Sequence, residues 1–163
     1  MTTSDNGISF ITRWEGSRNE VYLDPSKLPT LGVGHLLTPE ELVRLPVGTK
    51  ISDEQIKDYL RKDLSTAEKG VESNVVTELS QSEFDSLVSF TFNVGVHNFK
   101  KSTLLRLLNS GLSDDAGNEF LRWTFSQGRT LPGLVKRREA ERLLFLKGQY
   151  NESPGQGSQD HSE

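Results

Sequence analysis

Apolar residues recur every three or four positions in one long segment before the middle of the chain. The members of this series are Ile56, Tyr59, Leu60, Leu64, Ala67, Val71 and Val75. Such spacing places them along one face of an α-helix. Ser52 and Gln55 precede the series and form an S-x-x-Q pattern that is typical of a helix N-terminus. We therefore predict a long helix over about residues 52–77 that can connect two lobes.

Shorter helices are predicted on both sides of this segment. One is predicted over Asp5–Trp14, where apolar residues again form one face. Ser80 and Glu83 repeat the capping pattern ahead of the apolar stretch FDSLVSFTFNVG, which we predict as the central helix of the second lobe. Three further helices are predicted in the segments KSTLLRLLNSG, SDDAGNEFLRWTF and PGLVKRREAERLLFLKG.

Residues 16–38 show a different pattern, in which TLGVGHLL alternates apolar residues with glycine. This pattern favours short strands and tight turns, so we predict a small antiparallel sheet. The expected fold class is α+β and predominantly α. We expect one domain over residues 1–150, with a small lobe at about 12–55 and a helical lobe at about 80–148 that includes the N-terminal helix. Residues 151–163 are polar and rich in Gly, Ser and Gln, which predicts a flexible tail.

Charge and composition exclude several classes of function. The formal net charge is −4, and three of the acids lie in the last fourteen residues. The rest of the chain carries 19 basic and 20 acidic side chains, whereas a nucleic-acid-binding domain normally has a basic excess. The chain has no cysteine, and its histidines and acids lack the spacing of a metal site. We therefore expect no nucleic acid, metal or cofactor to be bound, and we expect the protein to act as a monomer.

Two acids in unlike surroundings lie near the N-terminus. Glu15 follows Trp14 at the end of the first predicted helix, where neighbouring apolar surface suits a general acid. Asp24 lies in a turn rich in proline and glycine, where backbone groups and solvent can keep it ionised. A pair of carboxyl groups in unlike environments is what glycoside hydrolysis requires. Thr30, taken by itself, is most simply a residue that satisfies a turn.

The order of these residues resembles a known catalytic signature. Glu15, Asp24 and Thr30 form the pattern E-x8-D-x5-T, followed by LGVGH. This pattern resembles that of the phage-type lysozymes, glycoside hydrolase family 24. The segments FDSLVSFTFNVG, KSTLLRLLNSG, FLRW and LPGLVKRREAERLLFLKG are similar to the second lobe of the same family, so the resemblance covers about residues 8–148. It implies a lysozyme-like catalytic domain with two lobes.

The resemblance also implies a role for each matched residue. Glu15 matches the general acid that protonates the glycosidic oxygen, Asp24 the carboxylate that supports the transition state and orients water, and Thr30 the hydroxyl that helps hold this water. The positions that match saccharide contacts are Leu36, Phe92, Ser102 and Asn118, the last depending on where a gap is placed. In this family an arginine of the last long helix often pairs with the catalytic glutamate, and Arg137 and Arg138 are the two candidates.

Two residues near the signature need a separate interpretation. The family commonly has glycine three positions after the catalytic aspartate, where this chain has Lys27. We therefore expect the turn to form in another way, with Pro25 and Pro29 fixing φ. His35 is most simply explained by an ion pair or a hydrogen bond at the sheet.

The resemblance implies a peptidoglycan hydrolase, an endo-β-1,4-N-acetylmuramidase that cleaves between N-acetylmuramic acid and N-acetylglucosamine. Two alternatives stay open: a chitinase-like or chitosanase-like hydrolase, and a non-catalytic glycan-binding module. The first residues, MTTSDNGISF, lack the regions of a signal peptide, and no apolar run approaches the roughly 18 residues that span a bilayer. We therefore expect no membrane insertion, synthesis in the host cytoplasm, and action on the cell wall in the periplasm after release by a separate route.

Overall fold

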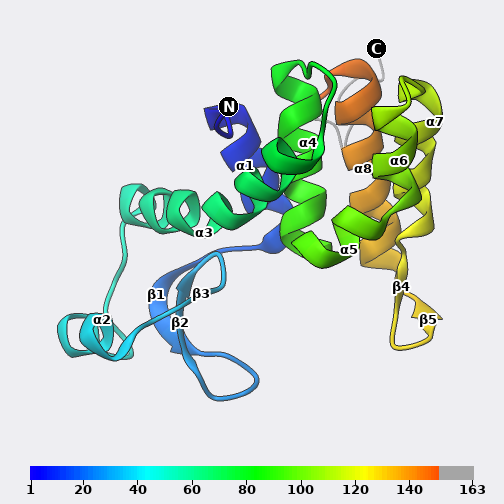
Figure 1. The fold of residues 1–163 in the computed structure, drawn as a ribbon. Coiled ribbons are helices and arrows are strands. Elements are labelled where there is room, and N and C mark those ends of the chain that lie inside the picture. The colour runs from blue at the N-terminus through cyan, green and yellow to red at the C-terminus, as the bar shows by residue number, and fades with distance from the viewer. Residues whose placement is uncertain (151–163) are drawn as a thin grey trace, which may run out of the picture. The chain divides into compact units, whose positions relative to one another are not determined.

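The computed structural model describes residues 1–150, and the predicted flexible tail over 151–163 lies outside the described residues. The chain divides into two compact units, whose elements are labelled in Figure 1. Unit 1 comprises Met1–Gly7 and the chain from Thr66 onward, and unit 2 comprises Ile8–Ser65. The predicted catalytic residues of the E-x8-D-x5-T pattern all belong to unit 2.

Unit 2 contains the small sheet that the sequence predicts. Its elements are most of α1 (Asp5–Glu15), β1 (Arg18–Leu23), β2 (Pro29–Gly32), β3 (His35–Leu36), α2 (Pro39–Arg44) and the first half of α3 (Asp53–Asn74). The three strands pair antiparallel in the order β1-β2-β3. On its other edge β1 pairs with residues 48–51, where the Val21 N–H donates to Thr49 O and the Ile51 N–H donates to Asn19 O. β1 is therefore hydrogen-bonded along both edges.

A glycine at the end of β2 allows the sheet to lie close to α3. Gly32 has a φ of 55°, and a Cβ there would lie 2.9 Å from Ile56 Cγ2. Glycine alone fits both the left-handed backbone and this close approach. Ile56 is buried, as are Val21, Leu31 and Leu60. Burying one such side chain contributes about 1.5–3 kcal/mol to stability, so these residues anchor the sheet.

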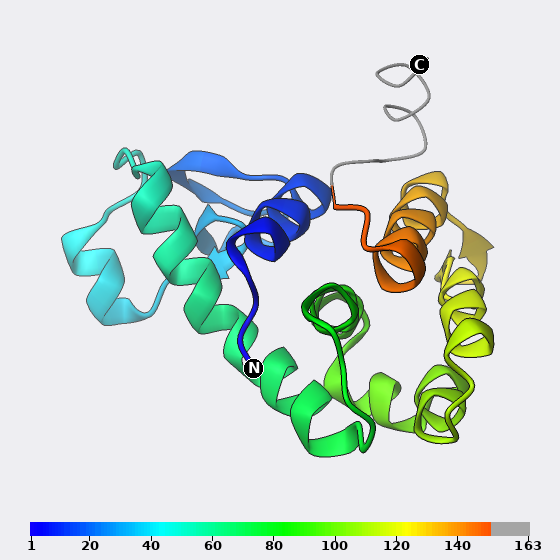
Figure 2. The same cartoon turned by 90° about the horizontal axis from the view of Figure 1, so that it is seen from above.

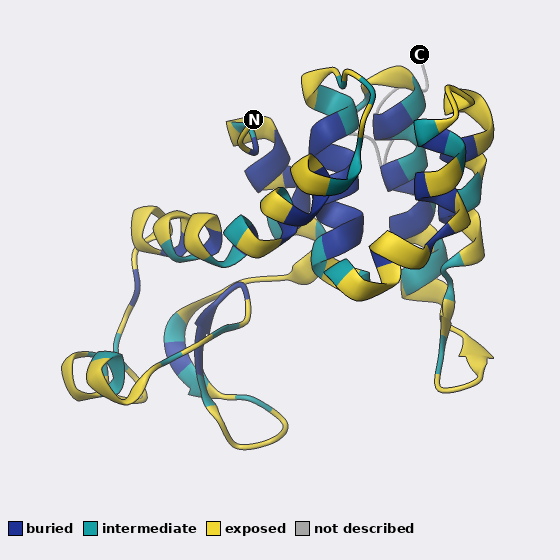
Figure 3. Ribbon diagram, in the orientation of Figure 1, coloured by how far each residue is buried: buried dark blue, intermediate teal, exposed yellow. Residues whose placement is uncertain are grey.

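Unit 1 is helical apart from one hairpin. Its elements after α3 are α4 (Gln81–Val94), α5 (Val96–Lys101), α6 (Thr103–Asn109), α7 (Ser113–Glu119), the 3₁₀ turn η1 (Phe120–Arg122), β4 (Phe125–Ser126), β5 (Arg129–Thr130) and α8 (Pro132–Lys147). α4 packs against α5 and α8, and Figure 2 shows it end-on among the helices of this unit. Every residue from Phe84 to Thr91 is buried, as the dark blue of α4 shows in Figure 3. The predicted central helix is therefore confirmed, and its apolar sequence reflects burial on all faces.

Side-chain caps begin several helices. The capping boxes predicted at residues 52–55 and 80–83 are both formed, at the starts of α3 and α4. A third capping box, made by Thr38 and Glu41, begins α2. This short helix was not predicted, although T-P-E-E carries the capping pattern with proline at the first helical position. The helix α5, which follows α4 after a single glycine, was not predicted either.

The segment after α7 differs from the prediction. The helix expected to begin at Ser113 ends at Glu119 and is followed by the 3₁₀ turn and the β4–β5 hairpin. The hairpin turns at Gln127 and Gly128, whose φ angles are 52° and 82°. Positive φ at both central residues is typical of a two-residue hairpin turn. The Q-G pair was the available signal, but the helical prediction was extended across it.

Two carboxylates hold the N-terminal segment in unit 1. Glu68 Oε2 accepts hydrogen bonds from the Thr3 N–H and hydroxyl, at 2.7 and 2.6 Å. The buried Asp85 accepts from the Ser4 N–H and hydroxyl and, at 2.7 Å, from the Tyr150 hydroxyl. Burial and the hydrogen bond to Asp85 raise the pKa of Tyr150 to about 12. The residues before α1 are therefore fixed to α3 and α4. Asp85 also joins them to Tyr150, which lies two positions after Gly148, the C-cap of α8.

Candidate active site

The loop between β1 and β2 (residues 24–28, Figure 1) carries Asp24, one of the two predicted catalytic carboxylates. The Lys27 N–H donates to Asp24 O at 2.7 Å, and the Asp24 N–H donates to Leu28 O at 2.9 Å. The Leu28 N–H donates to Asp24 Oδ1 at 2.8 Å. Within residues 1–150 no group donates a hydrogen bond to Asp24 Oδ2. The loop thus fixes one carboxylate oxygen of this half-buried aspartate and leaves the other able to accept.

The backbone of Leu28 also orients Thr30. Thr30 Oγ1 donates to Leu28 O at 2.8 Å. The hydroxyl proton is engaged, so the lone pairs of the oxygen stay available to accept from another donor. Thr30 pairs with Tyr22 across the sheet and is only 2% exposed. The backbone N–H and C=O of one residue, Leu28, therefore hold the carboxylate and the hydroxyl. This link was not predicted, because backbone contacts leave no side-chain pattern.

Lys27 makes the turn of this loop. Its φ is 65°, in the left-handed region. The expectation that the turn forms in another way is therefore wrong at this position: the lysine itself adopts a backbone conformation that glycine adopts without strain. A part for Pro25 and Pro29 in the turn stays a prediction. For a residue with a Cβ this conformation costs about 1–2 kcal/mol. The hydrogen bond from the Lys27 N–H to Asp24 O helps to hold it there.

Glu15 is the last residue of α1. Gly16 follows with a φ of 81°, and its N–H donates to Thr12 O at 2.9 Å, which ends the helix. The Glu15 side chain is exposed, whereas Trp14 is half-buried. The half-buried Trp14 lies next to it in the chain, and the expected apolar surface beside the Glu15 carboxyl group stays a prediction. Its position at the end of a helix directs it to the surface.

His35 lies between two carboxylates in unit 2. Its Nδ1 is 2.9 Å from Asp63 Oδ2, and its Nε2 is 3.0 Å from Glu41 Oε1. Its ring also packs on Tyr59, with ring centroids 4.5 Å apart. These contacts link β3 to α2 and α3, so the expected ion pair or hydrogen bond of His35 at the sheet is confirmed. His35 thereby supports the strand that lies next to Thr30.

Glu41 stabilises unit 2 near neutral pH, and this stabilisation is lost in acid. Burial raises the pKa of Glu41, but the hydrogen bond from the Thr38 N–H and the contact with His35 outweigh burial, so the pKa is lowered overall. A carboxyl group with a lowered folded pKa stabilises the fold above its unfolded pKa of about 4.3. This contribution is lost as the pH falls through the folded value.

We expect Glu41→Gln to lower the free energy of unfolding by about 1 kcal/mol near neutral pH and to have little effect below about pH 3. Glutamine also fits a capping box, so the substitution isolates the charge. Urea unfolding of both proteins at the two pH values measures the difference. A loss of equal size in acid would assign the effect to packing.

Two of the expected saccharide contacts have accessible side chains. Leu36 lies on β3, where it pairs with Thr30 across the sheet, and it is 52% exposed. Phe92 lies near the end of α4 in unit 1 and is half-buried. The binding role of both residues stays a prediction.

The other two expected contacts already have partners within unit 1. Ser102 is buried, and its hydroxyl caps α6 by accepting from the Leu105 N–H at 3.0 Å. Asn118 is exposed on α7, and its amide oxygen accepts from Arg142 Nε at 2.9 Å. Both residues therefore have a structural use, and their binding role also stays a prediction.

Arg137 and Arg138 form a buried charge cluster with Glu141 in unit 1. Arg137 Nε is 3.1 Å from Glu141 Oε2, and Arg138 Nε is 2.9 Å from Glu141 Oε1. The Ser89 hydroxyl donates to Glu141 Oε2 at 2.5 Å. No residue of the cluster is more than 4% exposed. The pairing of either arginine with Glu15 stays a prediction, and the sequence analysis missed Glu141.

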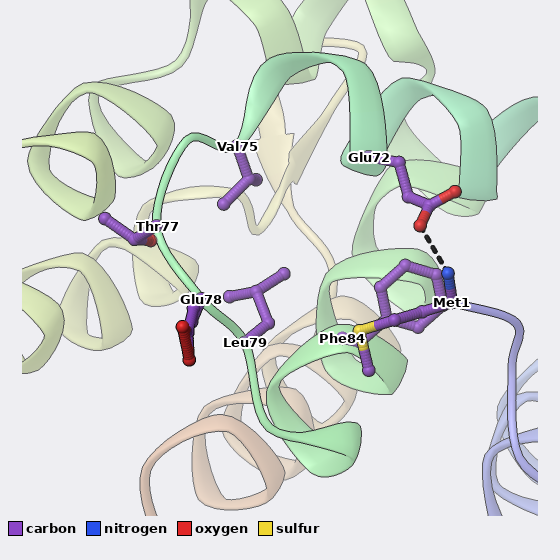
Figure 4. A pocket seen from close by; sticks show the side chains of 7 residues that line it. All are labelled: Met1, Glu72, Val75, Thr77, Glu78, Leu79 and Phe84. Atoms are coloured by element: carbon purple, nitrogen blue, oxygen red, sulfur yellow. Dashed lines mark hydrogen bonds and ion pairs between the residues drawn. The ribbon is translucent and has the colours of Figure 1, made fainter.

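The hollow drawn in Figure 4 lies elsewhere in unit 1. It has a volume of about 320 Å³ and is lined by Met1, Glu72, Val75, Thr77, Glu78, Leu79 and Phe84. The Met1 amino group forms an ion pair with Glu72 there. None of the candidate site residues lines this hollow. In the described part of the chain no three His, Asp or Glu side chains are grouped as a metal site, and no helix has the length and apolarity to cross a membrane.

Comparison with known proteins gives a consistent result. Residues 12–141 match the family model described as phage lysozyme. The chain is 41% identical over 151 residues to the endolysin of Bacillus phage B103 and 34% identical over 134 residues to the SAR-endolysin of Bacteriophage PS119. These alignments cover 91% and 82% of this chain. They cover 56% and 77% of the relatives, so the chain spans little more than half the length of the first.

The fold has a close counterpart among solved structures. The crystal structure of a P22 lysozyme mutant superposes with a TM-score of 0.82 at 36% sequence identity. The superposition covers 90% of this chain and 99% of the other. The predicted fold class, predominantly helical α+β with a small N-terminal antiparallel sheet, is confirmed.

Proposed function

The chain belongs to the phage lysozyme family, whose members are glycoside hydrolases, and on that premise we propose that it hydrolyses the peptidoglycan of bacterial cell walls. The bond cleaved is the β-1,4 bond between N-acetylmuramic acid and N-acetylglucosamine. The observation that carries the proposal is the backbone of Leu28, whose N–H donates to Asp24 and whose C=O accepts from Thr30, so that one residue orients both. Such an arrangement suits a pair that positions one water molecule.

Glu15 acts as the general acid. It donates its proton to the glycosidic oxygen while the bond from the anomeric carbon to that oxygen breaks. Its exposure is consistent with this role, because a bound glycan would cover the carboxyl group and exclude water from it. The last turn of α1, closed by the hydrogen bond from the Gly16 N–H to Thr12 O, holds the backbone that carries the Glu15 side chain.

Asp24 and Thr30 act on the attacking water. The water donates one hydrogen bond to Asp24 Oδ2 and one to Thr30 Oγ1, which both remain able to accept. Its oxygen lone pair then attacks the anomeric carbon, and Asp24 takes up the proton that is released. Leu36, Phe92, Ser102 and Asn118 are the proposed saccharide contacts.

We expect inversion at the anomeric carbon. Direct attack by Asp24 would give retention and needs carboxyl groups about 5–5.5 Å apart, whereas an intervening water needs about 6.5–9.5 Å and gives inversion. A nucleophilic aspartate has little need of a neighbouring hydroxyl oxygen. An attacking water does need one, because the hydroxyl oxygen accepts one of its hydrogen bonds and so orients it. Proton NMR of fresh products, read before mutarotation, should show the α-anomer first. An initial β-anomer would make Asp24 the nucleophile.

Mass spectrometry of fragments released from purified sacculi tests the reaction itself. Fragments with reducing ends are expected. Anhydro-muramyl ends would indicate a lytic transglycosylase, and turnover of chitosan instead of sacculi would favour the chitosanase-like alternative. Binding to sacculi without any release would favour the glycan-binding module. The site of action proposed is the cell wall, where this polymer lies.

A further inference from the structure

A strained lysine lies next to the catalytic aspartate. Lys27 is one of two residues other than glycine with positive φ in the described chain, and it lies three positions after Asp24. Strained backbone residues concentrate at functional sites, where a gain in function offsets their cost. We propose that Lys27 binds a carboxylate of the peptide side chains of peptidoglycan beside the cleaved bond. This inference rests on the proposed function.

The contacts within the chain give Lys27 no structural role for its charge. Its side chain is exposed, and no acidic residue among 1–150 forms an ion pair with it. The neighbouring cations differ in this respect. Lys50 pairs with Glu20 at 3.4 Å, and the Arg18 guanidinium lies 4.3 Å from the centre of the Tyr22 ring. The ammonium group of Lys27 is therefore available to a ligand.

The charges of substrate and site explain why a cation is useful here. The peptides of peptidoglycan carry free carboxylates, and in the mechanism proposed above Asp24 receives the proton of the attacking water as a carboxylate. Two like charges brought together repel, and the chain as a whole is acidic, with a net charge of −4. A cation three residues from Asp24 offsets this repulsion where the polymer approaches. Glycine at this position would relieve the strain but would remove the charge.

Three substitutions separate the charge of Lys27 from its backbone conformation. Lys27→Gln removes the charge and keeps a side chain at positive φ, as Gln127 has in the β4–β5 hairpin. Lys27→Arg keeps the charge. Lys27→Gly removes both charge and strain, so its melting temperature should rise above that of the wild type. Lys57→Gln is the matched control, because Lys57 is an exposed lysine on α3 without an ion pair in the described chain.

The experiment measures kcat/KM on purified sacculi and on the same sacculi with their carboxylates amidated. On intact sacculi at low ionic strength, Lys27→Gln and Lys27→Gly should lose about three- to fivefold, the range of one exposed charge pair. Lys27→Arg and Lys57→Gln should match the wild type. The loss should disappear on amidated sacculi, and also in about 0.5 M salt, where charges are screened within a few ångström.

Two results would overturn the inference while the proposed function stands. One is a Lys27→Gln enzyme as active as the wild type on intact sacculi at low ionic strength. The other is an equal loss on intact and amidated sacculi, which would assign the effect to the shape of the loop. If the wild type releases no fragments from sacculi, the proposed function itself fails, and this inference fails with it.

Discussion

Glu15→Gln is expected to lower kcat by about 10²- to 10⁴-fold, the range that general acid catalysis typically contributes. The amide has nearly the shape of the carboxyl group but has no proton to give to the leaving oxygen. Glu15 is exposed at the end of α1, so the substitution should leave the fold intact. The release of reducing ends from purified sacculi measures the rate, and the melting temperature checks folding.

Glu20→Gln is a suitable control for this experiment. Glu20 lies in the same unit, on β1, and its carboxylate pairs with Lys50 at 3.4 Å. An exposed pair of this kind contributes less than about 1 kcal/mol, so the control should keep both fold and activity. A Glu15→Gln enzyme within a few-fold of the wild type would mean that another group donates the proton.

Features of the fold that depend on local patterns were predictable from the sequence. The periodic apolar series and the capping boxes located α3 and α4, because helix ends and helix faces depend on residues close together in the chain. The helices α2 and α5 were missed because each is a turn or two long and has little periodicity. The β4–β5 hairpin was missed because the signal of Gln127–Gly128 is short and lies between strong helical patterns.

The candidate site was predictable in its residue types and less so in its geometry. The unlike surroundings of Glu15 and Asp24, together with the family resemblance of the E-x8-D-x5-T pattern, indicated carboxylate chemistry. The backbone N–H and C=O of Leu28, which contact Asp24 and Thr30, leave no side-chain pattern. The left-handed conformation of Lys27 was not predicted, because a residue with a Cβ rarely adopts positive φ. Sequence rules are expected to fail at functional or strained positions.

The second large effect is expected at Glu141. This carboxylate is 0% exposed and lies within 3.1 Å of both the Arg137 and the Arg138 guanidinium groups, while the Ser89 hydroxyl donates to it. Glu141→Gln removes the negative charge and leaves two buried cations side by side. Breaking a buried ion pair from one side costs about 3–5 kcal/mol, because the remaining charge stays desolvated.

For a chain of this size such a loss lowers the melting temperature by roughly 6–20 °C. Thermal unfolding followed by circular dichroism measures it. Glu139→Gln is the matched control, because Glu139 is on the same helix, only half-buried, and makes no ion pair within the described residues; its effect should stay within about 0.5 kcal/mol. Ser89→Ala should fall between the two, since it removes the hydrogen bonds of the Ser89 hydroxyl with Glu141 and Arg137 and leaves the charges paired. If Glu141→Gln has the same melting temperature as Glu139→Gln, other groups or water compensate the charges of the two arginines. Glu141 is then not the group that stabilises them in the core.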